Sequence, residues 1–254
     1  MVLVVDIGNT NMVVGVVDKG EVLVSERITS DVDKASGEYA VVIKSILQMY
    51  RISEFDLDGS IISSVVPMLN KVLKFAIEKI IPGHPLIVRN LSNLGINLKI
   101  ENPEELGDDL LVAASYGVEN YQLPLIVIDM GTSTTISVID SNRNFIGGAI
   151  MPGMKVSLDA LVSKTAQLCY TQIEKPKQVI GKNTEDCIKS GLIYGSAAML
   201  DCFLGKIEDE LGEKAFVVAT GGLCEYVVPY CNREIEIDRH LMLKGLYRLY
   251  LMNN

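Results

Sequence analysis

Two short segments of the chain place a carboxylate, a glycine and polar side chains at the end of an apolar run. They are VVDIGNTN, residues 4–11, and VIDMGTST, residues 127–134. Glycine at such a turn lets the backbone approach a ligand, and the free N–H groups form a concave site for phosphate. Asp6 and Asp129 would repel a bare phosphate, so they predict an intervening cation such as Mg²⁺. Either segment alone could be a polar turn, but the repeat favours two loops that clamp one polyphosphate.

Length, composition and charge limit the class of protein. The 254 residues allow one large or two modest domains, and the apolar fraction of 48% supports a real core. The net charge of −9 argues against binding to nucleic acid or to anionic membranes. No membrane span and no signal peptide are predicted from the apolar runs or the N-terminal residues. The five cysteines form no C-x-x-C pair and indicate reduced thiols in a cytoplasmic protein.

The same order of elements is predicted in each half of the chain. Apolar runs predict strands and 3.6-residue stripes predict helices. The two acid–glycine turns lie about half a chain length apart, which indicates a tandem duplication with α/β domains over residues 1–120 and 121–254. Strands are expected over residues 2–6, 12–17, 21–28, 59–64, 125–129, 134–139, 145–151 and 215–220. Helical stripes are expected over residues 42–50, 69–80, 200–211 and 240–251, and a further helix from about Pro103 or Leu106 to near Glu119.

Several motifs resemble one family over nearly the whole chain. DIGNTN, NPEELGDD, DMGTST, GGAIMPGMKVSLDAL, GKNT, SGLIYG and LKGL occur in the order found in type III pantothenate kinases, also labelled Baf-type proteins. VVATGGLCEY is similar to the adenosine turn of the actin-like ATPase superfamily. The resemblance implies two tandem ribonuclease H-like (actin-like ATPase) domains with the nucleotide cleft between them. It also implies a homodimer that phosphorylates pantothenate to 4′-phosphopantothenate, the first step of coenzyme A biosynthesis, using ATP, Mg²⁺ and a monovalent cation (K⁺ or NH₄⁺).

The resemblance also implies a role for individual residues. Asp6 is the Mg²⁺ ligand, Asp129 the monovalent-cation ligand, and Asp109 the general base that accepts the proton of the attacking hydroxyl. Thr165 is alternatively only a helix-end hydroxyl. The nucleotide set is Ile7, Gly8, Asn9, Thr10, Asn11, Thr132, Gly221 and Gly222, and the acceptor set is Ile100, Gly107, Asp108, Asp109, Leu110, Thr165 and Thr184.

The acceptor set departs from the family pattern. The family usually reads Gly-Ala-Asp-Arg where this chain has GDDL, residues 107–110, and it usually has tyrosine at the position of Ile100. An arginine can hold the carboxylate of pantothenate through two charge-assisted hydrogen bonds, which Leu110 cannot. Asp108 adds a negative charge. The sequence therefore predicts weak binding of pantothenate, and leaves open a kinase for another small alcohol or a regulatory, partner-binding protein with an intact ATP site.

Overall fold

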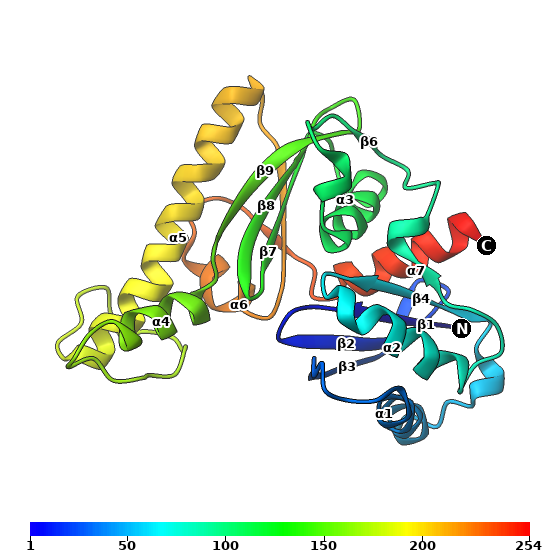
Figure 1. The fold of residues 1–254 in the computed structure, drawn as a ribbon. Helices are drawn as coiled ribbons and strands as arrows, with labels where there is room; N and C mark the ends of the chain where they lie inside the picture. The colour runs from blue at the N-terminus through cyan, green and yellow to red at the C-terminus, as the bar shows by residue number, and fades with distance from the viewer. The chain divides into compact units, whose positions relative to one another are not determined.

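The computed structural model describes residues 1–254 and divides into two α/β units (Figure 1). Unit 1 comprises residues 1–97, 101–120 and 240–254, and unit 2 comprises residues 98–100 and 121–239. The division expected from the sequence therefore differs in two places. The three residues 98–100 belong to unit 2, and the C-terminal segment belongs to unit 1, because its apolar side chains are buried there.

Unit 1 is built on a five-stranded sheet in the order β3-β2-β1-β4-β5. The first three strands form an antiparallel meander, and β4 and β5 continue from β1 in parallel. The meander turns at Lys19 and Gly20, which both have positive φ, as a tight hairpin requires. The strands are β1 (Val2–Ile7), β2 (Asn11–Asp18), β3 (Glu21–Thr29), β4 (Gly59–Ser64) and β5 (Leu86–Ile87).

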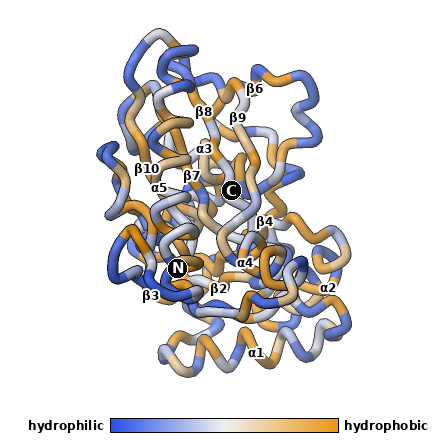
Figure 2. The backbone as a smooth tube through the Cα atoms, turned by 90° about the vertical axis from the view of Figure 1, so that its left-hand side faces the viewer, coloured by the Kyte–Doolittle hydropathy of each residue, from blue (hydrophilic) through white to orange (hydrophobic).

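Helices cover both faces of this sheet. Helices α1 (Ser36–Met49) and α2 (Pro67–Glu78) bury their apolar stripes in one core with β1 and β2. Figure 2 shows hydrophobic and hydrophilic residues alternating along α1. Helices α3 (Asp108–Asn120) and α7 (Leu241–Asn253) pack together, and α7 also packs on the sheet. Short 3₁₀ turns complete the unit: η1 (Glu54–Asp56), η2 (Val88–Asn90) and η3 (Pro103–Glu105).

Unit 2 repeats the strand order of unit 1. Its six-stranded sheet runs β11-β10-β7-β8-β9-β6, so a meander is again followed by parallel strands, with β6 (Asn97–Leu98) added at the edge. The identical order in both sheets supports the tandem duplication inferred from the acid–glycine turns. The other strands are β7 (Leu125–Met130), β8 (Ser133–Ile139), β9 (Asn144–Pro152), β10 (Phe216–Thr220) and β11 (Glu236–Ile237).

The long helix α5 (Thr184–Leu211) lies along one face of the second sheet (Figure 1). Asn183 caps its first turn, because the Asn183 side chain accepts a hydrogen bond from Asp186 N at 2.8 Å. Ile193, Leu200 and Leu204 pack into the core of unit 2. The remaining helices of the unit are α4 (Met154–Ser163), α6 (Cys224–Val227) and the 3₁₀ turn η4 (Val228–Tyr230).

By length and composition alone, α5 is long and apolar enough to cross a membrane. Its most apolar window has a mean hydropathy of 1.3, and 39% of that window is buried. No uninterrupted apolar run marks this helix in the sequence, because charged residues such as Lys189 and Asp201 interrupt it. A single such helix is weak evidence, since the core helix of a globular domain meets the same criterion.

Candidate functional site

The first acid–glycine turn directly follows β1. Asp6 is half-buried in the last part of the strand, opposite Val13 on β2 and Ser63 on β4. Gly8 N–H donates to the Asn11 carbonyl at 3.1 Å, and a Cβ atom on Gly8 would lie only 2.9 Å from that oxygen. The turn therefore requires glycine. Asn9 and Thr10 are exposed at its tip, where their side chains are accessible to a ligand.

Ser30 holds this turn from the far end of the meander. Its hydroxyl donates to the Gly8 carbonyl at 2.6 Å, and its backbone N–H donates to the Thr10 carbonyl at 3.1 Å. Sequence reasoning missed Ser30, which belongs to no motif. The strand register contained the signal, because Thr29 pairs with Asn11 and the next residue must therefore lie beside the turn.

The proposed base lies close to the first turn within unit 1. Val65 N–H donates to the Ile7 carbonyl at 3.0 Å, and the Val65 side chain approaches the Cβ position of Gly107 at 3.8 Å. The Asp109 carboxylate folds back over Gly107, so that any Cβ there would overlap it. The structure therefore brings together the first acid–glycine turn and the predicted base, which are about a hundred residues apart in sequence.

The Asp109 carboxylate is fixed at the first turn of α3. Leu110 N–H donates to Asp109 Oδ1 at 2.9 Å. Burial raises the pKa of Asp109, while the hydrogen bond from Leu110 N and the charge of Arg89 act to lower it. A carboxylate with a raised pKa is a stronger proton acceptor in its ionised form, which suits a general base.

Asp108 does not present the free negative charge expected from the sequence. Its side chain is buried, and Asp108 Oδ1 forms an ion pair with Arg89 Nη2 at 2.8 Å. Burial raises the pKa of Asp108, and the charge of Arg89 opposes that shift. This partner could not be predicted, because Arg89 lies nineteen residues earlier, in the short 3₁₀ turn η2, which gives no pairing signal.

The second acid–glycine turn meets the predicted adenosine turn in unit 2. Asp129 on β7 pairs with Thr220 on the parallel strand β10, so the two strands end side by side. Gly221 has a φ of +90°, and a Cβ atom there would lie 2.5 Å from Asp129 Oδ1. Gly131 is also close, since its Cβ position lies 3.4 Å from the same oxygen. Gly222 is exposed next to this group.

Gly153, the residue before α4, contacts the backbone of the second acid–glycine turn. Its N–H donates to the Thr132 carbonyl at 3.1 Å, and a Cβ atom there would overlap the carbonyl oxygens of Gly131 and Thr132. The Thr132 side chain is exposed. Gly153 was overlooked as a site residue, although it lies in the quoted segment GGAIMPGMKVSLDAL.

The other acceptor residues are not gathered in one unit. Ile100 is half-buried in unit 2, whereas Gly107 and Leu110 lie in unit 1. Thr165 is exposed, and its hydroxyl donates to the Leu161 carbonyl at 2.9 Å, which is the helix-end role considered as the alternative. Thr184 is exposed as the first residue of α5.

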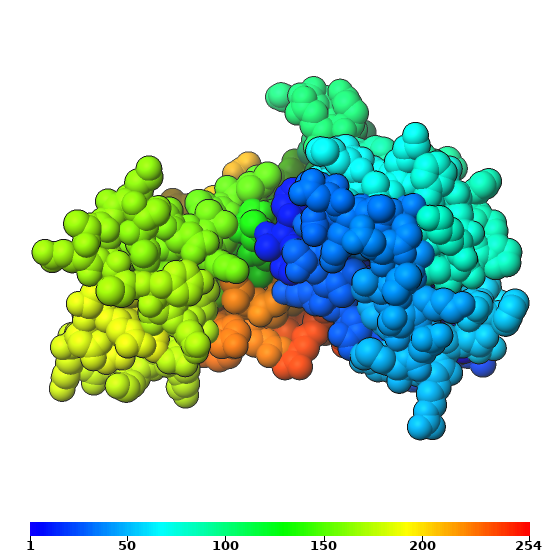
Figure 3. Space-filling model, turned by 60° about the horizontal axis from the view of Figure 1, so that its bottom comes forward, coloured from blue at the N-terminus to red at the C-terminus, as the bar shows by residue number.

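The segment between Thr165 and Thr184 is tied to α5 by a buried lysine. Lys189 forms ion pairs with Glu174 and, at 2.7 Å, with Glu185, and its side chain is only 8% exposed. Glu185 also accepts a hydrogen bond from the Thr171 hydroxyl at 3.2 Å. Figure 3 shows this segment in yellow-green on the surface of unit 2. Lys189 therefore determines where the segment lies on the helix.

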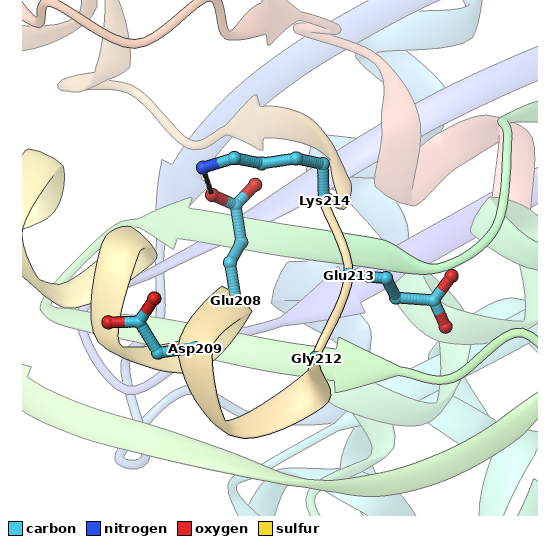
Figure 4. A pocket seen from close by; sticks show the side chains of 5 residues that line it. All are labelled: Glu208, Asp209, Gly212, Glu213 and Lys214. Carbon is cyan, nitrogen blue, oxygen red and sulfur yellow. Dashed lines mark hydrogen bonds and ion pairs between the residues drawn. The ribbon is translucent and has the colours of Figure 1, made fainter.

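An open hollow at the end of α5 contains none of the predicted site residues (Figure 4). Glu208 accepts hydrogen bonds from Lys214 Nζ at 2.6 Å and from Ala215 N at 3.1 Å. Arg233 Nη2 donates to the same carboxylate at 2.5 Å. Burial acts to raise the pKa of Glu208, but these partners outweigh it and lower the pKa. The charged groups beside this hollow therefore pair with one another at the end of α5.

Each acid–glycine turn has features that suit a phosphate group bound together with a cation. No group of three or more His, Cys, Asp or Glu side chains gathers as a metal cage. Mg²⁺ in nucleotide sites is held by one or two carboxylates together with phosphates and water, so a single carboxylate at each turn fits. The glycine at each turn leaves the backbone open, as close approach of a phosphate requires.

Two sheets with the same strand order and an acid–glycine turn after each first strand define a two-domain ribonuclease H-like ATPase fold. A protein of Campylobacter jejuni described as a Baf family transcriptional activator has this fold, with TM-score 0.61, 21% identity, and 99% of this chain and 98% of that chain covered. So does the activator of the 2-hydroxyisocaproyl-CoA dehydratase from Clostridium difficile, with bound ADPNP (TM-score 0.56, 12% identity, 99% and 93% covered).

Sequence comparison identifies the family within this class. A family model for type III pantothenate kinase matches residues 2–206. A type III pantothenate kinase of Bacillus cytotoxicus is 38% identical over 253 residues, covering 100% of this chain and 97% of that protein. The chain belongs to the type III pantothenate kinase family, and it is a kinase that uses ATP.

Proposed function

We propose that the chain phosphorylates pantothenate with ATP to give 4′-phosphopantothenate, as the first step of coenzyme A biosynthesis in the cytoplasm. The observation that carries this proposal is the full-length similarity to a type III pantothenate kinase. The fold supports it, because the two acid–glycine turns are each held by specific contacts.

The nucleotide is assigned to the glycine turns of both units. In unit 1, residues 8–11 bind ATP phosphates and Asp6 is the Mg²⁺ ligand; when bound, Mg²⁺ neutralises phosphate charge during transfer. In unit 2, Thr132 contacts phosphate, and Asp129 is the ligand of a monovalent cation, K⁺ or NH₄⁺. Gly221 and Gly222 leave space for the adenosine. The assignment of Asp129 and Gly221 to one site is supported by the contact between the Asp129 carboxylate and the Gly221 backbone.

Asp109 is assigned as the base. The acceptor hydroxyl oxygen forms a bond to the γ-phosphorus, the bond from that phosphorus to the β,γ-bridging oxygen breaks, and the hydroxyl proton passes to an Asp109 oxygen. Positioning and cation charge supply most of the rate acceleration. Half-burial and the Leu110 N–H hydrogen bond support this role, because they fix the direction of the carboxylate.

The acceptor pocket is assigned to Ile100, Gly107, Leu110, Thr165 and Thr184 in a homodimer. The pairing of Asp108 with Arg89 removes one objection to an anionic acceptor, since the added charge is compensated. Leu110 still offers no donor to the pantothenate carboxylate. Light scattering at micromolar concentration tests the dimer, and a monomer would contradict it. The acidic net charge of −9 favours a small-molecule acceptor over nucleic acid or an anionic membrane.

A coupled phosphorylation assay tests the proposal. The wild-type protein is assayed with pantothenate beside a panel of small alcohols, together with Asp109→Asn and, as a matched control, Glu105→Gln, an exposed carboxylate nearby. We expect turnover of pantothenate, a loss of about 10²–10⁴-fold in Asp109→Asn, and no change in the control. Turnover of another alcohol but not pantothenate, or ATP binding without any turnover, would refute the assignment.

A further inference from the structure

Arg89 directly follows strand β5, at the side of the first sheet where its parallel strands have their C-terminal ends. Strands β1, β4 and β5 run in the same direction, so the first acid–glycine turn, Ser64 and Arg89 all emerge at one edge. The first turn of α3, with Asp108 and Asp109, lies at this edge too, since Val65 touches the Gly107 position. Arg89 is therefore a cationic side chain within the unit 1 part of the site.

The Arg89 guanidinium joins three points of the segment that precedes the base. It donates to the Glu104 carbonyl at 3.1 Å and to the Leu106 carbonyl at 2.6 Å, and it forms the 2.8 Å ion pair with Asp108. The planar fork of an arginine suits several fixed acceptors at once, and a lysine cannot reproduce it. The segment from the η3 turn to α3 is thereby locked in one position.

The ion pair is needed because Asp108 is 2% exposed. A buried carboxylate without a partner is strongly unfavourable, so removing Arg89 forces Asp108 to take up a proton or to move towards water. Asp109 follows Asp108 in the same helical turn, and its position over Gly107 leaves little tolerance. Movement of Asp108 therefore displaces the Asp109 carboxylate.

We propose that Arg89 is a positioning residue for phosphoryl transfer, which acts by compensating the buried charge of Asp108 and so fixing the Asp109 carboxylate. The inference rests on the proposed function, because it assigns Asp109 as the base. It also accounts for a departure noted in the sequence. Where the resembling family usually has alanine, this chain has Asp108, a buried charge that requires a partner. Arg89 and Asp108 are thus interdependent, and losing both is less harmful than losing Arg89 alone.

The test compares Arg89→Met, Arg89→Lys, Asp108→Ala and the double variant Arg89→Met/Asp108→Ala. In Arg89→Met we expect kcat with pantothenate to fall by on the order of 10–100-fold, as for a small displacement of a catalytic group, with the KM for ATP unchanged. Arg89→Lys is expected to be intermediate. Asp108→Ala removes the buried charge itself and leaves Arg89, which is 43% exposed, to be solvated, so its loss of kcat should be smaller than that of Arg89→Met. The double variant should recover most of the lost kcat.

Equal losses in Arg89→Met and the double variant would overturn the proposal, because they would mean that Arg89 acts on the substrate itself. Wild-type kcat in Arg89→Met would overturn it as well. Hydrogen exchange of residues 104–111, measured without substrate, makes the pair testable even if pantothenate is not turned over. Faster exchange in Arg89→Met that is reversed in the double variant supports the pair, and unchanged exchange refutes it. Failure of the wild-type protein to phosphorylate pantothenate would refute the proposed function alone.

Discussion

Replacement of Gly221 by alanine tests the contact between the second acid–glycine turn and the adenosine turn. Gly221 has a φ of +90°, and an alanine Cβ would lie 2.5 Å from Asp129 Oδ1 and 2.6 Å from Met130 N. The backbone conformation costs an L-residue about 1–2 kcal/mol. Forcing a methyl group against strand β7 costs roughly a further 1–3 kcal/mol. We therefore expect Gly221→Ala to lower the free energy of unfolding of unit 2 by about 2–5 kcal/mol.

The matched control is Gly212→Ala at the end of α5. Gly212 also has positive φ, +76°, but nothing lies within 4 Å of its Cβ position. This variant carries only the backbone cost of about 1–2 kcal/mol. The difference between the two variants therefore isolates the steric contact with β7.

Urea unfolding and calorimetry with Mg·ATP measure the two consequences. Displacement of Asp129 should weaken nucleotide binding in Gly221→Ala by at least about tenfold, which corresponds to about 1.4 kcal/mol, while Gly212→Ala binds like the wild type. If both variants lose equal stability and bind ATP equally, Asp129 does not lie against Gly221, and the assignment of these two turns to one nucleotide site is wrong.

Four further changes test other parts of the site. Asp6→Asn should weaken the affinity for Mg·ATP in calorimetry, and unchanged affinity would remove Asp6 from the metal site. Asp109→Asn should raise thermal stability at pH 7, because burial raises the pKa of Asp109 and the ionised carboxylate therefore destabilises the fold. This gain should vanish as the pH falls below about 3.9, because the wild-type carboxyl is then protonated in both the folded and the unfolded state. Leu110→Arg should lower the KM for pantothenate without changing the KM for ATP, and an unchanged pantothenate KM would exclude position 110 from carboxylate binding. Lys189→Met should shift global stability by less than about 1 kcal/mol, because its partners are solvated, yet accelerate proteolysis within residues 164–183; an unchanged cleavage rate would show that the ion pairs of Lys189 do not hold this segment on α5.

Local sequence signals were sufficient for the eight longer strands and for the fold class, but not for the two-residue strands β5, β6 and β11. The predicted strand over residues 59–64 is confirmed in full, and the others differ by about one residue at each end. Each strand is an apolar run bounded by Asp, Gly or a polar turn, so its limits are visible in the sequence. The start of α5 was not visible, because Gly191, Gly195 and the buried polar residues Lys189 and Ser190 interrupt its apolar stripe.

Some contacts between segments distant in sequence could be predicted from the sequence, and others could not. The proximity of Asp129 and Gly221 follows from the duplicated strand order, since parallel strands that are neighbours must end together. The pairing of Arg89 with Asp108 does not follow from any pattern, because it joins a short 3₁₀ turn to the first residue of a helix nineteen residues later. The helical stripe after His240 was recognised, but an amphipathic stripe does not reveal which sheet it will cover.

The location of α7 in unit 1 has a consequence for the order of events during synthesis. Leu243 fits beside Gly15, Gly245 fits beside Val112, and the Tyr250 hydroxyl donates to the Asp58 carbonyl at 3.1 Å. Unit 1 therefore begins at the N-terminus but cannot complete its core until the ribosome has made all of residues 121–239. Domains usually fold in the order in which they are translated. Here every strand of the second sheet is made before α7 completes unit 1. A nascent chain that stops before Leu241 therefore leaves the face of the first sheet that α7 covers exposed to chaperones and proteases.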